Sequence, residues 1–169
     1  MDAARQSCRR NQRQLEEGTV CGKGCFRGTQ VMFVVVDASV WVSRLVENDE
    51  FHIPVKDWMN AQREQDTTFV SPSLLLAEVG GVISRVTGKP ELGLNAIQKI
   101  ENLPNVRIVD MDKALMDDAS RIAAQYGVRG ADSIYIAVAS TLKIPLVTFD
   151  IEQRAKASKL VDVIEIPVE

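Results

Sequence analysis

Several residue types that common catalytic and metal sites require are scarce in this sequence. Its 169 residues include one histidine, His52, and three cysteines, Cys8, Cys21 and Cys25, all within the first thirty residues. The rest of the chain therefore has no disulfide framework, and we expect it to work in a reducing environment such as the cytoplasm. Cys21 and Cys25 resemble half of a zinc site, but no second pair and no histidine cluster completes one. No nucleophile with a partnered base is visible, and His52, among charged neighbours, is expected at the surface.

Long apolar runs and an excess of positive charge are also missing. The longest apolar run, residues 31–36, is far too short to span a membrane, so we expect no membrane association. The net charge is −3, and residues 31–169 hold 14 basic and 20 acidic side chains. Strong nonspecific binding to nucleic acid is not expected from this balance. A nucleic-acid enzyme could still carry such a charge if metal ions hold some of its acids.

The first thirty residues differ in composition from the rest of the chain. They are rich in arginine and glutamine and then in glycine, and they contain no apolar stretch that could make a signal peptide. We interpret residues 1–30 as a flexible leader outside the fold, and residues 31–169 as one domain. Met32 stands just before the first expected strand, so a shorter chain beginning there is expected to fold and function equally well.

From residue 31 onward, short apolar strands alternate with amphipathic helices. The strands are expected at residues 31–36, 67–70, 106–109, 146–149 and 161–166. Between them, helices are expected at about 38–45, 53–65, 73–86, 92–100, 112–126, 132–142 and 151–156. Ser73 and Asp112 are expected to cap two of these helices, and Gly127 to end one. This alternation predicts an α/β fold with a parallel sheet.

Two aspartates each follow an apolar strand directly. Asp37 comes after Val34, Val35 and Val36, and Asp150 ends the run that begins at Leu146. If the two strands are neighbours, both carboxylates emerge at the carboxyl edge of the sheet, where ligands of open α/β folds bind. The structural alternative is that each aspartate only caps the helix after it, a role that Ser39 could share with Asp37.

Two further acids lie on helices that are expected to pack on that edge. Glu78 borders an apolar stripe at helical spacing, where a carboxylate is costly unless it is paired or bound to metal. Its alternative is an exposed flank position or an ion pair with Arg85. Asp132 opens a helix that is apolar on nearly all sides and is therefore buried, and its alternative is simple N-capping.

Four such carboxylates in one cleft would repel one another and raise one another's pKa. Divalent cations relieve this repulsion, and ligands that are all oxygen favour Mg²⁺ or Mn²⁺ over zinc. Ions of this kind at the edge of a sheet are suited to the hydrolysis of phosphodiester bonds.

The same residues carry a family resemblance, which covers residue 32 to about residue 168. Four segments resemble, in order and spacing, those of a PIN domain, with the VapC-type toxins of prokaryotic toxin–antitoxin pairs as the most similar pattern: Val34-Val-Val-Asp37-Ala-Ser39, Ser73-Leu-Leu-Leu-Ala-Glu78-Val, Arg129-Gly-Ala-Asp132-Ser-Ile-Tyr-Ile-Ala and Leu146-Val-Thr-Phe-Asp150. The resemblance implies a three-layer sandwich, with helices on both sides of a five-stranded parallel sheet. It also implies a Mg²⁺- or Mn²⁺-dependent endoribonuclease.

The resemblance assigns site residues and partners as well. Asp37, Glu78, Asp132 and Asp150 would be the catalytic and metal-binding acids, with Ser39 and Thr148 as supporting hydroxyl groups. An RNA substrate, an antitoxin protein that covers the acidic cleft and a homodimer are implied as partners. Spare apolar surface for the dimer is expected from four side chains, namely Trp41, Trp58, Leu74 and Leu76.

Other functions fit less well. A haloacid-dehalogenase-type phosphatase needs a second aspartate at position 39, which is serine here, and a receiver domain needs paired acids and a lysine that this chain does not offer. The remaining alternative is a PIN-like module that binds RNA or a protein without cutting. The intact set of four acids argues against it, because an inactive site need not keep them.

Overall fold

A parallel β-sheet forms the centre of the molecule. The computed structural model describes residues 32–167, so the expected leader, residues 1–30, lies outside the described residues. The sheet contains β1 (Phe33–Val36), β2 (Thr68–Pro72), β3 (Val106–Val109), β4 (Leu146–Val147) and β5 (Val163–Ile164). Their order is β3-β2-β1-β4-β5, and all four pairings are parallel. The predicted sheet of five parallel strands is confirmed, with β1 at its centre.

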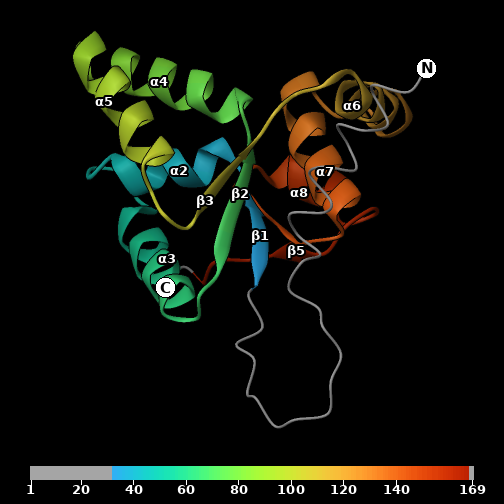
Figure 1. Cartoon of the computed structure of the whole chain (residues 1–169), viewed down its shortest axis with the longest axis horizontal. Helices are drawn as coiled ribbons and strands as arrows, with labels where there is room; N and C mark the ends of the chain where they lie inside the picture. The colour runs from blue at the N-terminus through green and yellow to red at the C-terminus, as the bar shows by residue number, and fades with distance from the viewer. Residues whose placement is uncertain (1–31, 168–169) are drawn as a thin grey trace, which may run out of the picture.

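Helices cover both faces of this sheet (Figure 1). On one side lie α2 (Ala38–Leu45) and α3 (His52–Glu64), and on the other α6 (Lys113–Tyr126), α7 (Gly130–Leu142) and α8 (Ile151–Ala157). The pair α4 (Leu74–Thr87) and α5 (Pro90–Glu101) stands beyond the carboxyl ends of β1 and β2. The three-layer α/β sandwich is therefore confirmed. No helix in the described part of the chain is both long and apolar enough to cross a membrane.

The helices α4 and α5 approach each other closely because glycines face across their contact. A Cβ atom added to Gly93 would lie 2.5 Å from the carbonyl oxygen of Gly80. At this position the two backbones leave no room for a side chain. The close packing fixes the position of α5 against α4, the helix that carries Glu78.

Some boundaries differ from the prediction. The fourth strand ends at Val147, because the next residue, Thr148, accepts a hydrogen bond from the backbone N–H of Asp150 and the chain turns there. β5 is correspondingly limited to the two residues that pair with β4. Ser73 makes no side-chain cap bond to α4, because its backbone is already helical and its N–H donates to the carbonyl of Val109.

The expectation that Trp41 supplies spare apolar surface is wrong, and Trp58 and His52 are only partly exposed. Trp41 is 2% exposed, and its Nε1–H donates to the hydroxyl of Ser71 over 3.3 Å. Trp58 is half-buried against Phe69, with ring centroids 5.9 Å apart, so only part of its side chain remains at the surface. His52 is also half-buried, with Nδ1 3.0 Å from the carbonyl oxygen of Ser43. More exposed apolar side chains lie on several helices, with Ile53 on α3, Val86 on α4, Leu94 on α5 and Ile151 on α8 among them.

Candidate active site

Asp37 occupies the carboxyl end of the central strand and also begins a helix. Its Oδ2 accepts hydrogen bonds from the backbone N–H of Ser39 at 3.0 Å and from the Ser39 hydroxyl at 2.6 Å. The same oxygen lies 3.3 Å from the hydroxyl of Thr148. The cap interpretation is therefore correct, but it does not exclude a role in chemistry. Although Asp37 is only 6% exposed, every one of these contacts falls on one of its two carboxylate oxygens.

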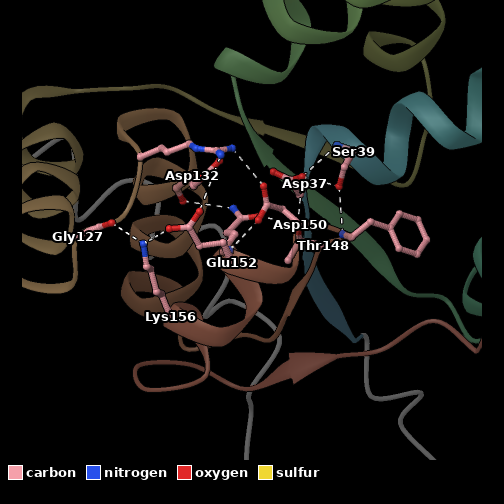
Figure 2. Close-up of polar contacts among 11 residues, drawn as sticks. Asp37, Ser39, Gly127, Asp132, Thr148, Asp150, Glu152 and Lys156 are labelled. Carbon is pink, nitrogen blue, oxygen red and sulfur yellow. Dashed lines mark hydrogen bonds and ion pairs between the residues drawn. The ribbon is translucent and has the colours of Figure 1, made fainter.

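Asp150 stands beside Asp37 because β1 and β4 are neighbours in the sheet (Figure 2). Its Oδ1 accepts from the backbone N–H of Gln153 at 2.8 Å and so caps α8. Its Oδ2 lies 3.4 Å from the guanidinium of Arg129. The two strand-end aspartates therefore share one edge, as predicted from the order of the strands.

Asp132 lies in the first turn of α7 and does not cap it. The helix begins at Gly130, and its cap position is Arg129, whose side chain makes no cap bond. The capping alternative for Asp132 is therefore wrong. The pKa of its carboxyl is raised from 3.8 to about 6, first by burial and then by the negative charges of Asp150 and Asp37. The positive charge of Arg129 partly offsets this rise.

Glu78 is half-buried on α4 and is paired with Tyr135 of α7, not with Arg85. The Tyr135 hydroxyl donates to Glu78 Oε2 over 2.7 Å. Burial raises the pKa of the Glu78 carboxyl, the bond from Tyr135 lowers it, and the charges of Asp37 and Asp132 raise it again. The four acids, from four separate segments, thus lie near enough for their charges to interact.

The same acids do not form a ready-made coordination sphere. Between residues 32 and 167, no three histidine, cysteine or acidic side chains lie close enough together to hold one metal ion. Charge interactions act over several ångströms, whereas oxygen ligands of Mg²⁺ or Ca²⁺ stand only about 2.0–2.6 Å from the ion. Carboxylates that share an edge but point apart account both for the interaction of their charges and for the lack of a ligand cluster among the described residues. Their all-oxygen chemistry fits Mg²⁺ or Mn²⁺, provided that the side chains turn toward one another.

Three residues at this edge were not singled out from the sequence. Tyr135 lies three positions after Asp132, and this helical spacing could have indicated a shared face. Arg129 forms ion pairs with Asp150 and Glu152, at 3.4 and 3.8 Å. Gln153 is a buried polar side chain on α8, and no local pattern in the sequence indicates its contacts.

A groove elsewhere on the surface does not coincide with these acids. It has a volume of about 500 Å³ and lies between the end of α2 and the pair α4–α5, where Leu45, Ile83 and Leu92 are among its lining residues. None of the four acids lines it. In the described part of the chain, the groove has no cluster of titratable side chains like the one at the sheet edge, so we assign the candidate active site to the sheet edge.

Comparisons with known proteins agree with this architecture. The family model of the PIN domain matches residues 34–159. Among solved structures, the chain is similar to VapC20 of Mycobacterium tuberculosis, a sarcin-ricin loop cleaving toxin, at 19% identity and a TM-score of 0.66, over 78% of this chain and 99% of that one. It is also similar to VapBC2 of Rickettsia felis, bound to a promoter DNA fragment, at 15% identity, a TM-score of 0.61 and coverage of 79% and 98%. For FitAcB of Neisseria gonorrhoeae, the identity is 21%, the TM-score 0.58 and the coverage 78% and 96%. No curated protein has a significant sequence match. At these identities, the structural similarity shows the fold alone.

Proposed function

Since this chain belongs to the PIN domain family, we propose that it is a Mg²⁺- or Mn²⁺-dependent endoribonuclease and the toxin of a toxin–antitoxin pair. One observation carries the proposal: Asp37, Glu78, Asp132 and Asp150 come from four segments, and their charges act on one another at one sheet edge. Such repulsion in a partly buried place destabilises the fold, and bound divalent cations would remove it. The similarity to a sarcin-ricin loop cleaving toxin and to VapBC2 of Rickettsia felis supports the biological role.

Each residue would have a distinct task in phosphodiester hydrolysis. The four carboxylates would hold the metal, with the Ser39 hydroxyl fixing the orientation of Asp37 and Thr148 standing 3.3 Å from the same carboxylate oxygen. A divalent cation held there would lower the pKa of water and stabilise charge on the phosphate oxygens. Asp37 and Asp150, fixed at the ends of neighbouring strands, would give the site its rigid part. Glu78 on α4 and Asp132 on α7 would supply the other two carboxylates of the site.

The test is cleavage of RNA by the purified protein with and without chelator. We expect cleavage to stop in EDTA and to return with Mn²⁺ or Mg²⁺, and Asp37→Asn and Asp150→Asn to abolish it. Asp57→Asn, at an exposed position on α3, is the matched control and should cleave normally. Cleavage that continues in EDTA would contradict the metal mechanism.

A second candidate is a PIN-like module that binds RNA or a protein without cutting. The observation in its favour is that no three described acids already stand at ligand distance from one point. RNA binding without cleavage, in millimolar Mn²⁺ and with several RNA substrates, would favour this alternative over the nuclease.

The partners belong to the same proposal. We expect a cytoplasmic protein that binds an antitoxin over the acidic edge and forms a homodimer. Light scattering at micromolar concentration tests for the homodimer, and a monomer would contradict this expectation. Co-expression with the product of a neighbouring small gene tests the first, because an antitoxin should co-purify and inhibit cleavage.

A further inference from the structure

Gln153 is an unusual side chain for its place in the fold. It is 1% exposed, on the short helix α8, and an amide buried to this degree is costly unless hydrogen bonds satisfy it. Its partners lie at the acidic edge. The Thr148 hydroxyl is 2.5 Å from Gln153 Oε1, and Gln153 Nε2 donates to the backbone carbonyl of Asp132 over 3.4 Å.

The contacts of Gln153 reach two of the four segments that carry acids directly, and through Thr148 they come close to a third. Its backbone N–H donates to Asp150 Oδ1 at 2.8 Å, its Nε2 holds the first turn of α7 at Asp132, and its Oε1 reaches Thr148, which stands 3.3 Å from Asp37. The orientation of the amide is fixed by chemistry. If the amide were flipped, its oxygen would face the carbonyl oxygen of Asp132, and two acceptors would oppose each other.

The hydroxyl of Thr148 lies near both Gln153 and Asp37, so its hydrogen bonding links the amide to the acid. Thr148 Oγ1 accepts from the N–H of Asp150 at 3.1 Å and has only one proton to donate. Its distance to Gln153 Oε1 is 0.8 Å shorter than its distance to Asp37 Oδ2, so the proton is directed to the amide. Asp37 then keeps the two bonds from Ser39 and is not drawn further towards Thr148.

We propose that Gln153 is a positioning residue that sets the spacing of Asp37, Asp132 and Asp150 for metal binding. This inference rests on the proposed function. Without its amide, the Thr148 proton turns to Asp37, and the first turn of α7 loses its tie to α8. The carboxylates then lose the relative placement from which they would turn toward one ion. Residues behind metal ligands typically change metal affinity or activity by about 10–100-fold when they are replaced.

The experiment measures Mn²⁺ binding to the full chain by calorimetry, together with RNA cleavage across a Mn²⁺ titration. Gln153→Leu keeps the volume of the side chain and removes both amide contacts. We expect it to weaken Mn²⁺ binding by about 10–100-fold and to raise the Mn²⁺ concentration for half-maximal cleavage equally, with the KM for RNA unchanged.

Thr67→Val is the matched control. Thr67 is as buried as Gln153, at 1% exposed, and its hydroxyl donates to Gln62 over 3.0 Å next to the amino end of β2, away from the acids. This variant should lower the melting temperature and leave Mn²⁺ affinity unchanged, which separates loss of stability from loss of positioning. Combined with Gln153→Leu, it should not change the Mn²⁺ affinity further, whereas Thr148→Val and Gln153→Leu together should weaken binding by less than the product of their separate effects.

The outcomes distinguish this inference from the function on which it rests. Wild-type affinity for Mn²⁺ in Gln153→Leu overturns the positioning role and leaves the nuclease intact. Weaker Mn²⁺ binding in the variant, with no RNA cleavage by either protein, supports positioning and overturns the nuclease. A wild type that does not bind Mn²⁺ overturns both. If Gln153→Leu does not fold, Gln153→Met is measured in its place, and failure of both to fold shows a structural role instead.

Discussion

The Tyr135 hydroxyl donates to Glu78 across 2.7 Å and joins α7 to α4 at the acidic edge. Tyr135 is fully buried, and burial together with the charge of Glu78 raises the pKa of its hydroxyl, so the group remains a donor at every physiological pH. One side-chain hydrogen bond therefore joins two helices that carry acids, although the two bonded residues are 57 positions apart in sequence.

Replacing this hydroxyl tests how much the bond contributes to the site. In Tyr135→Phe, Glu78 loses its donor, and we expect the Mn²⁺ requirement for cleavage to rise about 10-fold. The free energy of unfolding should fall by only about 1 kcal/mol, because one hydrogen bond is lost and the ring remains. The control is Tyr126→Phe, at the end of α6, the other tyrosine of the chain. Equal Mn²⁺ requirements in both variants would show that the bond does not orient Glu78.

The raised pKa of Asp132 predicts a pH-dependent stability. The folded chain binds this proton more tightly than the unfolded chain, since the pKa is raised from 3.8 to about 6. The free energy of unfolding therefore falls as the pH rises from about 4 to about 6, and it remains lower above that range. Because the carboxyl is only partly buried and solvent screens its charge, we expect a cost of about 1 kcal/mol at pH 7.

Asp132→Asn removes this cost. In EDTA at pH 7, the variant should melt about 3 °C above the wild type, and the difference should vanish near pH 4. Millimolar Mg²⁺ should stabilise the wild type more than the variant, because the ion binds the folded site alone. Melting curves at both pH values, with Asp57→Asn as control, measure the effect. A variant that melts below the wild type at pH 7 would contradict the electrostatic argument.

Arg129 predicts opposite effects on metal and RNA. Its side chain is 70% exposed, and its guanidinium forms ion pairs with Asp150 and Glu152 at the edge. Arg129→Gln removes a positive charge that opposes a cation, so Mn²⁺ should bind several-fold more tightly. The KM for RNA should rise, because a phosphate loses a nearby cation.

The control for this prediction is Arg121→Gln, an exposed position on α6 whose ion pair is with Asp118. Raising the salt concentration should reduce the effect of Arg129→Gln, since exposed charges are screened. Calorimetry in low and high salt measures the difference. Unchanged affinity at low salt would mean that Arg129 does not compete with a metal ion.

Residues 1–30 are expected to be dispensable. A chain that begins at Met32 should melt within error of the full chain and cleave RNA at the same rate. Differential scanning calorimetry and a cleavage assay measure both properties. A clear loss of melting temperature would show that the leader packs on the domain.

The sequence by itself determined those features that depend on residues close together in the chain. Val34–Val36 predicted a strand buried on both faces, because a continuous run of apolar β-branched side chains suits such a position, and Asp37 was correctly placed at its end. α6 was predicted at both ends. Asp112 accepts from the N–H of Leu115, and Gly127 takes the left-handed backbone with φ 63°. Caps and strand ends depend on a few consecutive residues, so their signals survive in the sequence.

The tertiary structure decided the contacts between distant segments. Whether Asp132 caps its helix, which partner Glu78 has, and whether Trp41 is exposed all depended on the packing of helices across the sheet. The local pattern allowed each alternative. Gln153 gave no signal, because its partners Thr148 and Asp132 come together only when β4 lies beside β1 and α7 packs on the same edge. Burial gives such a polar side chain its importance, and burial is a property of the packed molecule.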